Sequence, residues 1–158
     1  MEAQELLKAF MRQAAQQVYA VTAEHEGEFA ALTASSVTSL SLNPPLMMVS
    51  VDKGSRSHGP LVRARGFVVH LLSEEEQKIA EVMASRLPPK EKLEAVGYEQ
   101  SPYGPVIRGA KSYLLLEKYA VYEAGDHDIV IGKIVGGKIG EVTRPLLYHS
   151  RAYTGIRA

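Results

Sequence analysis

Apolar residues recur near the start of the chain at the three- and four-residue spacing of one face of an α-helix. The residues of this stripe are Ala3, Leu6, Leu7, Phe10, Met11, Ala14 and Ala15. The pattern predicts an amphipathic helix that ends near Gln17 and covers another part of the protein with its apolar face.

From Val18 onward the periodicity changes to short runs rich in apolar and β-branched residues, which favour strands. Residues 18–23 and 29–35 are two such runs, and the polar, glycine-containing segment 25–28 joins them. We therefore expect a β-hairpin here. Further strand patterns follow at residues 46–51, 67–72, 111–124, 129–139 and 145–148.

Helix signals are fewer in the rest of the chain. Ser57 can cap a short helix that runs to Arg65, and Ser73 with Glu76 has the spacing of a capping box at the start of another helix. Residues 87–105 are rich in proline and glycine and are expected to form a surface loop.

About six or seven strands, connected mostly by turns, favour a mainly β fold with flanking helices over a doubly wound sheet. We expect a closed or partly open antiparallel barrel. No linker divides the chain, so residues 1–158 are expected to be a single domain. The long strand from Tyr113 to Tyr122 would leave an edge or an apolar face to be covered, which favours a homodimer.

Composition narrows the functional classes. The 158 residues are 46% hydrophobic, and 18 Lys and Arg balance 18 Asp and Glu, so no basic field invites nucleic acid. The chain has no cysteine, which excludes disulfides, thiolate metal sites and cysteine nucleophiles, and the histidine spacings predict no metal site. The N-terminus has no signal-peptide pattern and no apolar run is long enough to span a membrane, so we expect a cytoplasmic protein.

Three segments carry candidate chemistry. The first is residues 32–41, where six hydroxyl residues lie among small and apolar ones directly after a strand. Small side chains let a ligand approach the backbone, and hydroxyl groups donate hydrogen bonds without adding charge. A threonine- and serine-rich edge strand is the structural alternative.

The second segment is residues 50–57, where glycine, serine, lysine and arginine precede a predicted helix. Such a segment can bind phosphate, although a capped loop with solvated charges explains it as well. The third is Gly125-Asp126-His127, in which Asp126 or Asp128 could orient the imidazole beside a substrate. A plain hairpin turn is the alternative.

Taken in order, these blocks resemble the flavin reductase family of the FMN-binding split barrel. The resemblance is carried by residues 31–46, Ser55-Arg56-Ser57, residues 67–72 with Gln77 and Ala80, residues 125–132, and residues 145–148 with Arg151 and Tyr153. It implies a homodimeric antiparallel split barrel that binds FMN or FAD, takes hydride from NADH or NADPH, and supplies reduced flavin to a partner monooxygenase.

The resemblance also implies roles for particular residues. His127 would approach the flavin and the nicotinamide as the catalytic residue. The cofactor-binding residues would be Thr33, Ala34, Ser35 and Ser36 along the flavin ring; Ser50, Val51, Ser55, Arg56 and Ser57 at the ribityl phosphate; and Tyr148 or Tyr153 as a wall of the pocket.

Two departures from the family pattern bear on substrate preference. Members often have a Pro-Thr-Gly turn where this chain has Gln16-Gln17-Val18, and asparagine where it has His70.

Two other functions would use the same candidate binding residues. One is an FMN-binding electron carrier that keeps the flavin as a prosthetic group, and the other is a split barrel that binds a different ligand such as haem.

Overall fold

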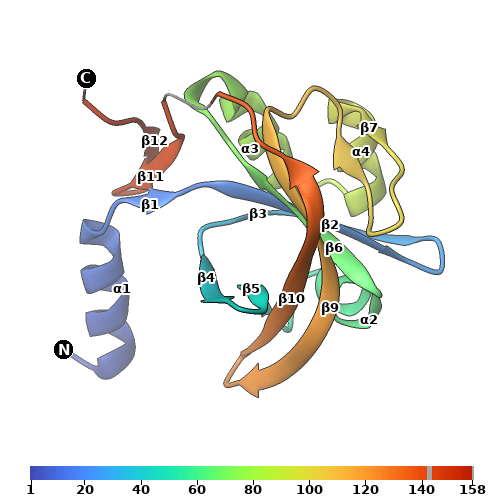
Figure 1. Cartoon of the computed structure of the whole chain (residues 1–158). Coiled ribbons are helices and arrows are strands. Elements are labelled where there is room, and N and C mark those ends of the chain that lie inside the picture. The colour runs from blue at the N-terminus through green and yellow to red at the C-terminus, as the bar shows by residue number, and fades with distance from the viewer. Residues whose placement is uncertain (142–143, 158) are drawn as a thin grey trace.

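The computed structural model describes residues 1–141 and 144–157 (Figure 1). The helical elements are α1 (Ala3–Gln13), α2 (His58–Arg63), the 3-10 turn η1 (Glu74–Glu76), α3 (Gln77–Met83) and α4 (Pro89–Val96). The strands of the main sheet are β2 (Tyr19–His25), β3 (Glu28–Ala34), β4 (Val37–Leu42), β5 (Pro45–Asp52), β6 (Gly66–Leu71), β9 (Ser112–Ala124) and β10 (His127–Lys138). The short strands are β1 (Gln16–Gln17), β7 (Tyr98–Glu99), β8 (Val106–Ile107), β11 (Leu147–His149) and β12 (Ala152–Thr154).

The main sheet is antiparallel and has the order β3-β2-β6-β9-β10-β5-β4. The two outer strands, β3 and β4, follow one another directly in the chain at Ser35-Ser36. They are not paired, so the barrel is open at this point. The predicted mainly β, antiparallel fold is confirmed.

Successive strand residues point to opposite sides of the sheet, and in the predicted hairpin both sides are buried, each in its own apolar cluster. Val21 packs into a cluster with Phe67, Leu116 and Val130. Leu61 of α2 belongs to the same cluster. The neighbouring Ala20 faces a second cluster, together with Ala31, Met83 of α3 and Leu93 of α4. Helices α3 and α4 therefore cover the outer face of β2 and β3.

The buried imidazole of His70 links three parts of the fold. It lies 2.9 Å from the carbonyl oxygen of Ala20 through Nδ1, and its Nε2 accepts a 3.0 Å bond from the backbone N–H of Ile107. Because Nε2 is the acceptor, Nδ1 carries the proton and the ring is neutral. Complete burial lowers the pKa of His70 to about 4, which keeps it neutral at physiological pH.

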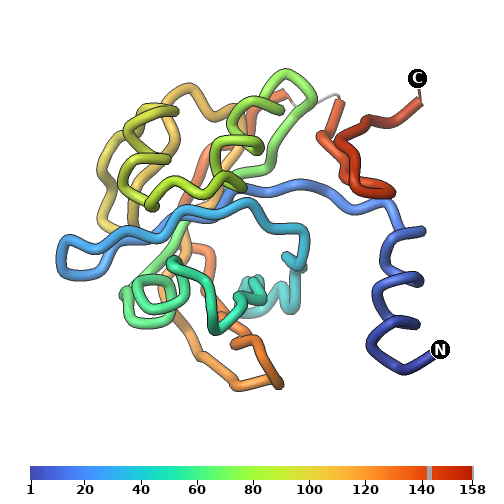
Figure 2. The backbone as a smooth tube through the Cα atoms, turned by 180° about the vertical axis from the view of Figure 1, so that it is seen from behind, coloured from blue at the N-terminus to red at the C-terminus, as the bar shows by residue number. Residues whose placement is uncertain are grey.

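The structure corrects two expectations about the N-terminal helix. It ends at Gln13 instead of Gln17, because Ala14 is extended and Gln16–Gln17 pair with β11. Its apolar face is also left largely uncovered by the residues that the structure describes: Leu7 and Phe10 are 63% and 72% exposed. Figures 1 and 2 both show α1 standing apart from the barrel.

Three further expectations need correction. Residues 87–105 are not only a loop, because α4 begins at Pro89, where the first helical turn tolerates proline. Strand β9 has no free edge, since β6 and β10 pair with it on either side. Helix α2 ends at Arg63, before the predicted Arg65. The capping box of Ser73 and Glu76 is confirmed.

Within the described residues, no helix combines the length and the apolar character needed to cross a membrane.

Candidate functional site

A groove opens at the end of β3, where the chain leaves one edge strand and begins the other. Ser35 and Ser36 form this bend, and two hydrogen bonds hold it against β5: Ser50 N–H donates to the carbonyl of Ser36 at 3.1 Å, and the Ser36 hydroxyl donates to the carbonyl of Ser50 at 3.3 Å. The backbone of the bend is thus fixed while the Ser35 side chain stays exposed. Beyond the bend, the remaining hydroxyl residues form the edge strand β4, as the structural alternative predicted.

The groove has a volume of about 420 Å³ and brings together three segments that are distant in sequence. The predicted site residues that line it are Thr33, Ala34, Ser35, Ser36, Ser50, Val51, Ser55 and His127. These residues meet because β3 ends at the groove and β5 runs alongside it. His127, at the start of β10, is paired with Asp52 at the end of β5. Met83, the last residue of α3, and the following Ala84 also line the groove.

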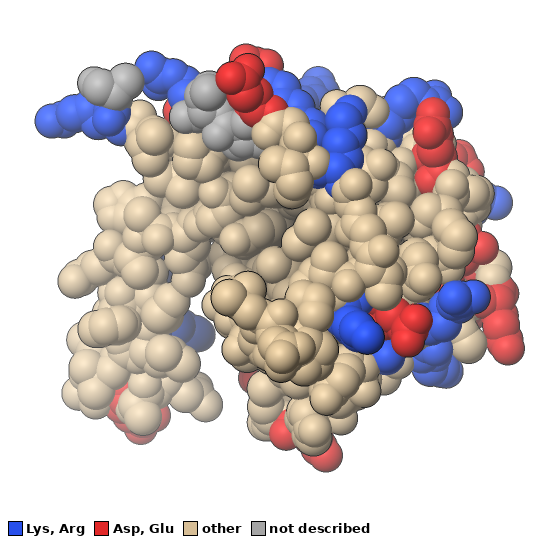
Figure 3. Space-filling view, in the orientation of Figure 1, with Lys and Arg blue, Asp and Glu red and all other residues tan. Residues whose placement is uncertain are grey.

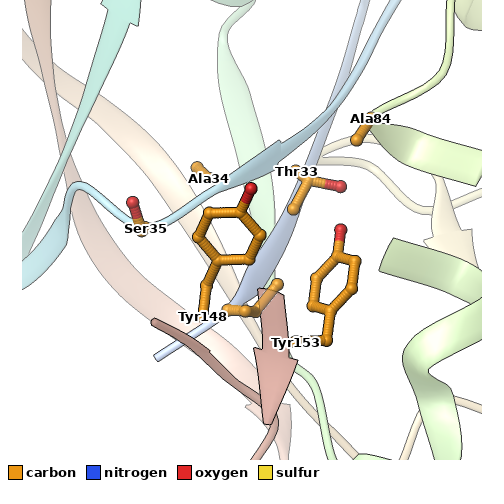
Figure 4. Close-up of a pocket in the computed structure, with 7 residues that line it drawn as sticks. Thr33, Ala34, Ser35, Ala84, Tyr148 and Tyr153 are labelled. Atoms are coloured by element: carbon orange, nitrogen blue, oxygen red, sulfur yellow. The ribbon is translucent and has the colours of Figure 1, made fainter. Parts of the chain in front are cut away.

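A smaller hollow of about 220 Å³ adjoins one end of the groove and shares Thr33, Ala34 and Ser35 with it. Figure 4 shows that Tyr148 and Tyr153 point into this hollow from β11 and β12. Their rings pack edge to face with centroids 5.2 Å apart. Burial raises the pKa of Tyr153, so its phenol stays protonated.

The other end of the groove meets the loop before α2, but not all its hydroxyls face a ligand. Ser57 is buried, and its Oγ accepts a 2.9 Å bond from Ala31 N–H and donates at 3.2 Å to the Ala31 carbonyl. Ser57 occupies the N-cap position of α2 without making a side-chain cap. Its hydroxyl therefore joins the loop to β3, while Ser55 lines the groove and Arg56 a neighbouring hollow.

Lys92 is a site residue that the sequence did not reveal. It lies on α4, in the segment expected to be a loop, and lines the groove although it is only 8% exposed. Its Nζ donates to the carbonyl oxygens of Met83 at 2.6 Å and Ala31 at 3.1 Å. Burial and the nearby charge of Arg56 lower the pKa of Lys92. Finding it would have required recognising Pro88-Pro89 as a helix start.

His127, the first residue of β10, also lines the groove. Its Nδ1 lies 2.7 Å from Oδ1 of Asp126, and this hydrogen bond lowers the pKa of the Asp126 carboxyl group. With Nδ1–H directed at the carboxylate, Nε2 is the nitrogen available to a ligand. Of the two acidic neighbours suggested by the sequence, Asp126 is therefore the one that orients this ring.

Asp128 has a different partner. Its Oδ2 lies 2.6 Å from Nε2 of His58, the first residue of α2. Both side chains are largely shielded from solvent, with exposed fractions of 23% for His58 and 14% for Asp128. The pair joins the loop that carries Ser55 and Arg56 to the strand that carries His127.

The geometry can be compared with known proteins. The sequence model described as "Flavin reductase like domain" matches residues 11–157. This chain belongs to that family. A flavin reductase from Pseudomonas putida is 34% identical to this flavin reductase-like chain over 143 residues, covering 89% of this chain and 83% of the relative.

Two further relatives extend the comparison. The reductase component of 4-hydroxyphenylacetate 3-monooxygenase from Thermus thermophilus is 33% identical over 149 residues, which cover 94% of either protein. The solved structure of the NADH:FAD oxidoreductase SgcE6 from Streptomyces globisporus, in complex with NAD and FAD fragments, superimposes with a TM-score of 0.87 at 25% identity. That alignment covers 98% of this flavin reductase-like chain and 93% of the structure.

Proposed function

We propose that this protein is an NAD(P)H:flavin oxidoreductase that reduces FMN or FAD with NADH or NADPH and releases the reduced flavin to a partner monooxygenase. The observation that carries the proposal is the groove itself, where a strand end of small hydroxyl residues, a cationic end and an oriented imidazole meet. The relative that is a monooxygenase reductase component supports the partner.

The residues fit a flavin along the length of the groove. The ring would lie against residues 33–36, where small side chains leave the backbone accessible, with Tyr148 and Tyr153 as the wall at one end. The phosphate would lie at the other end, near Ser55 and Lys92. The groove volume of about 420 Å³ falls in the usual range for small-molecule sites.

When bound together, nicotinamide and flavin supply the hydride chemistry themselves. The chain's residues then have to bind, orient and exclude water. Asp126 holds the Nδ1 proton of His127, which leaves Nε2 to hydrogen-bond the ligands and to fix the nicotinamide over the flavin. Holding two reactants in reactive geometry is worth up to about 7–11 kcal/mol in favourable systems.

The decisive experiment is anaerobic mixing of the purified protein with excess FMN or FAD and with NADH or NADPH, following the loss of oxidised-flavin absorbance. Many turnovers of free flavin per protein are expected. Tight binding of FMN without bleaching by either nicotinamide would favour the prosthetic-group carrier instead. Absence of any flavin binding would contradict both functions.

We also propose that the protein acts as a homodimer. Leu7 and Phe10 of α1 are mostly exposed among the residues that the structure describes, and Leu40 and Leu42 on the edge strand β4 are 47% and 93% exposed. Figure 3 shows a face almost free of charge across α1 and the neighbouring part of the barrel, with a deep gap beside the helix. A second copy would cover these surfaces. Light scattering should give the mass of a dimer; the mass of a monomer would contradict this.

The proposal includes a cytoplasmic location, because NADH and NADPH are regenerated in the cytoplasm and the reaction consumes them.

A further inference from the structure

Helix α2 lies at one end of the barrel and ends without a cap of its own (Figure 1). Ala64, and not a glycine, follows its last residue, and the backbone there is extended, so the chain does not fold back over the helix end. The last carbonyl groups of a helix have no partner within it. Those of α2 therefore need hydrogen-bond donors from another part of the protein.

Lys118 of β9 supplies these donors. Its Nζ donates to the carbonyl oxygens of Leu61 at 2.8 Å, Val62 at 2.9 Å and Ala64 at 2.5 Å. Its backbone N–H donates to the carbonyl oxygen of Arg65 at 2.7 Å. An ammonium group has three N–H donors, and all three are used here. One residue therefore pairs with four carbonyl groups at the end of this helix.

The three side-chain bonds require the charged form of Lys118, because a neutral amine has only two N–H donors. The side chain is half-buried, and burial lowers the pKa of its amine to about 8. This pKa is still above 7, so the ammonium form prevails at neutral pH. A methionine at this position would have a similar length and no donor, and would leave three carbonyl groups unpaired.

The opposite end of α2 carries the loop that is proposed to bind the flavin phosphate. Ser57 bonds to both backbone groups of Ala31, and Nε2 of His58 lies 2.6 Å from Oδ2 of Asp128. Ser55 of the same loop lines the groove. The six residues of α2 span only about 9 Å, so a displacement of the end that Lys118 caps also moves the end that carries the loop.

We propose that Lys118 is a positioning residue for flavin binding, because its cap on α2 holds the loop before α2 in the conformation that receives the flavin. The inference rests on the proposed flavin reductase function. Lys118 is not among the residues that line the groove, so its contribution to flavin affinity passes through α2.

The test compares the wild type with Lys118→Met, with the milder Lys118→Gln and with Ile107→Ala. Ile107 is 1% exposed in the apolar cluster that α3 and α4 cover, so its truncation controls for a general loss of stability. Hydrogen exchange of the peptide 55–65, equilibrium flavin binding by fluorescence and steady-state kinetics are measured on the same samples. The temperature is one at which circular dichroism shows the compared proteins to be folded.

We expect the amides of residues 55–65 to exchange at least about tenfold faster in Lys118→Met, and flavin to bind about tenfold more weakly. The KM for flavin should rise by the same factor while kcat stays within about twofold of the wild type, since the reacting groups are unchanged. Lys118→Gln keeps two N–H donors and should show a smaller effect in the same direction, which decides the question if Lys118→Met does not fold. Ile107→Ala should keep the wild-type exchange of this peptide and the wild-type flavin affinity.

Wild-type flavin affinity in the folded Lys118 variants would overturn the inference. An equal loss of affinity in Ile107→Ala would also overturn it, because the effect would then follow from stability alone. Both outcomes leave the reductase function intact. If the wild type itself neither bound nor reduced flavin, the reductase function would be wrong and the positioning role would fall with it.

Discussion

The Nε2 atom of His58 lies 2.6 Å from Oδ2 of Asp128, and this contact connects the two halves of the proposed site. His58 begins α2 directly after the loop that carries Ser55 and Arg56, and Asp128 follows His127 on β10. This interaction therefore joins the loop that is proposed to bind the anion to the strand that carries the imidazole.

Breaking this pair should disturb both ligands at once. We expect Asp128→Ala to lower the free energy of unfolding by about 1–3 kcal/mol, because His58 loses its partner in a largely shielded position. The KM values for flavin and nicotinamide should both rise. Asp128→Asn, whose amide oxygen can still accept the bond, should recover most of the loss.

Urea unfolding and steady-state kinetics on the same samples measure both effects. Glu123→Ala is the control, because it breaks only the exposed pair with Lys53 near the same hairpin. If Asp128→Ala behaved like this control, the coupling would not exist.

Replacement of His127 should act mainly on the nicotinamide. We expect His127→Ala to lower kcat/KM for NADH or NADPH at least about tenfold, a modest part of what a positioned polar group contributes. Asp126→Ala should give a smaller decrease, since it removes only the orienting partner. Turnover and nicotinamide affinity equal to those of the wild type would show that His127 plays no part in the reaction.

The buried His70 predicts a loss of stability in acid. Its pKa is about 4 in the folded state against 6.5 ordinarily, so the unfolded chain binds a proton that the folded chain refuses. Above pH 6.5 the neutral His70 costs the folded state nothing. As the pH falls from 6.5 toward 4 the free energy of unfolding decreases, and the loss is about 2 kcal/mol at pH 5.

Urea unfolding of the wild type and of His70→Asn at pH 7.5 and pH 5 checks this. Asparagine cannot titrate, so the variant should lose less stability between the two pH values. His149→Asn, at an exposed position, should retain the wild-type dependence. Equal pH dependence in all three proteins would rule out His70 as the source.

Two glycines of β10 offer a matched packing test. A Cβ at Gly132 would lie 2.7 Å from Phe67 and from Leu116 in the barrel core, whereas a Cβ at Gly136 would meet only Leu115 at an ordinary 3.5 Å. Gly132→Ala should therefore lower the unfolding free energy by about 1–3 kcal/mol, and Gly136→Ala by much less. Thermal unfolding of both variants measures the difference, and equal effects would show that Gly132 is not in close contact with Phe67 and Leu116.

Much of the fold could be predicted because the signals are local. The apolar and β-branched runs of residues 18–23 and 29–35, the glycine turn between them and the capping box each specify their own local structure. The exposed face of α1 could not be predicted, because a 3.6-residue stripe indicates that an apolar face exists and not what covers it. Helix α4 was missed because two prolines were interpreted as breakers when one of them begins the helix.

The candidate site divides in the same way. The small hydroxyl residues and the histidine suited to flavin binding could be recognised in the sequence. The sheet register brings residues 33–36 and His127 to one groove. Tertiary partners are not visible in a sequence. Ser57 bonds to Ala31, Asp126 and not Asp128 orients His127, and Lys92 enters the groove from a distant helix.

Flavin binding to a variant whose groove is filled by a large side chain shows whether the flavin occupies this groove. Ala84 lines both the groove and the hollow beside Tyr148 and Tyr153, and its side chain is exposed. Ala95 is exposed on α4 and lines neither of them, so Ala95→Trp is the matched control. Fluorescence titration should show flavin affinity at least about tenfold weaker in Ala84→Trp and unchanged in Ala95→Trp, because an indole occupies space that the ligand needs. Wild-type affinity in a folded Ala84→Trp would show that flavin binds elsewhere.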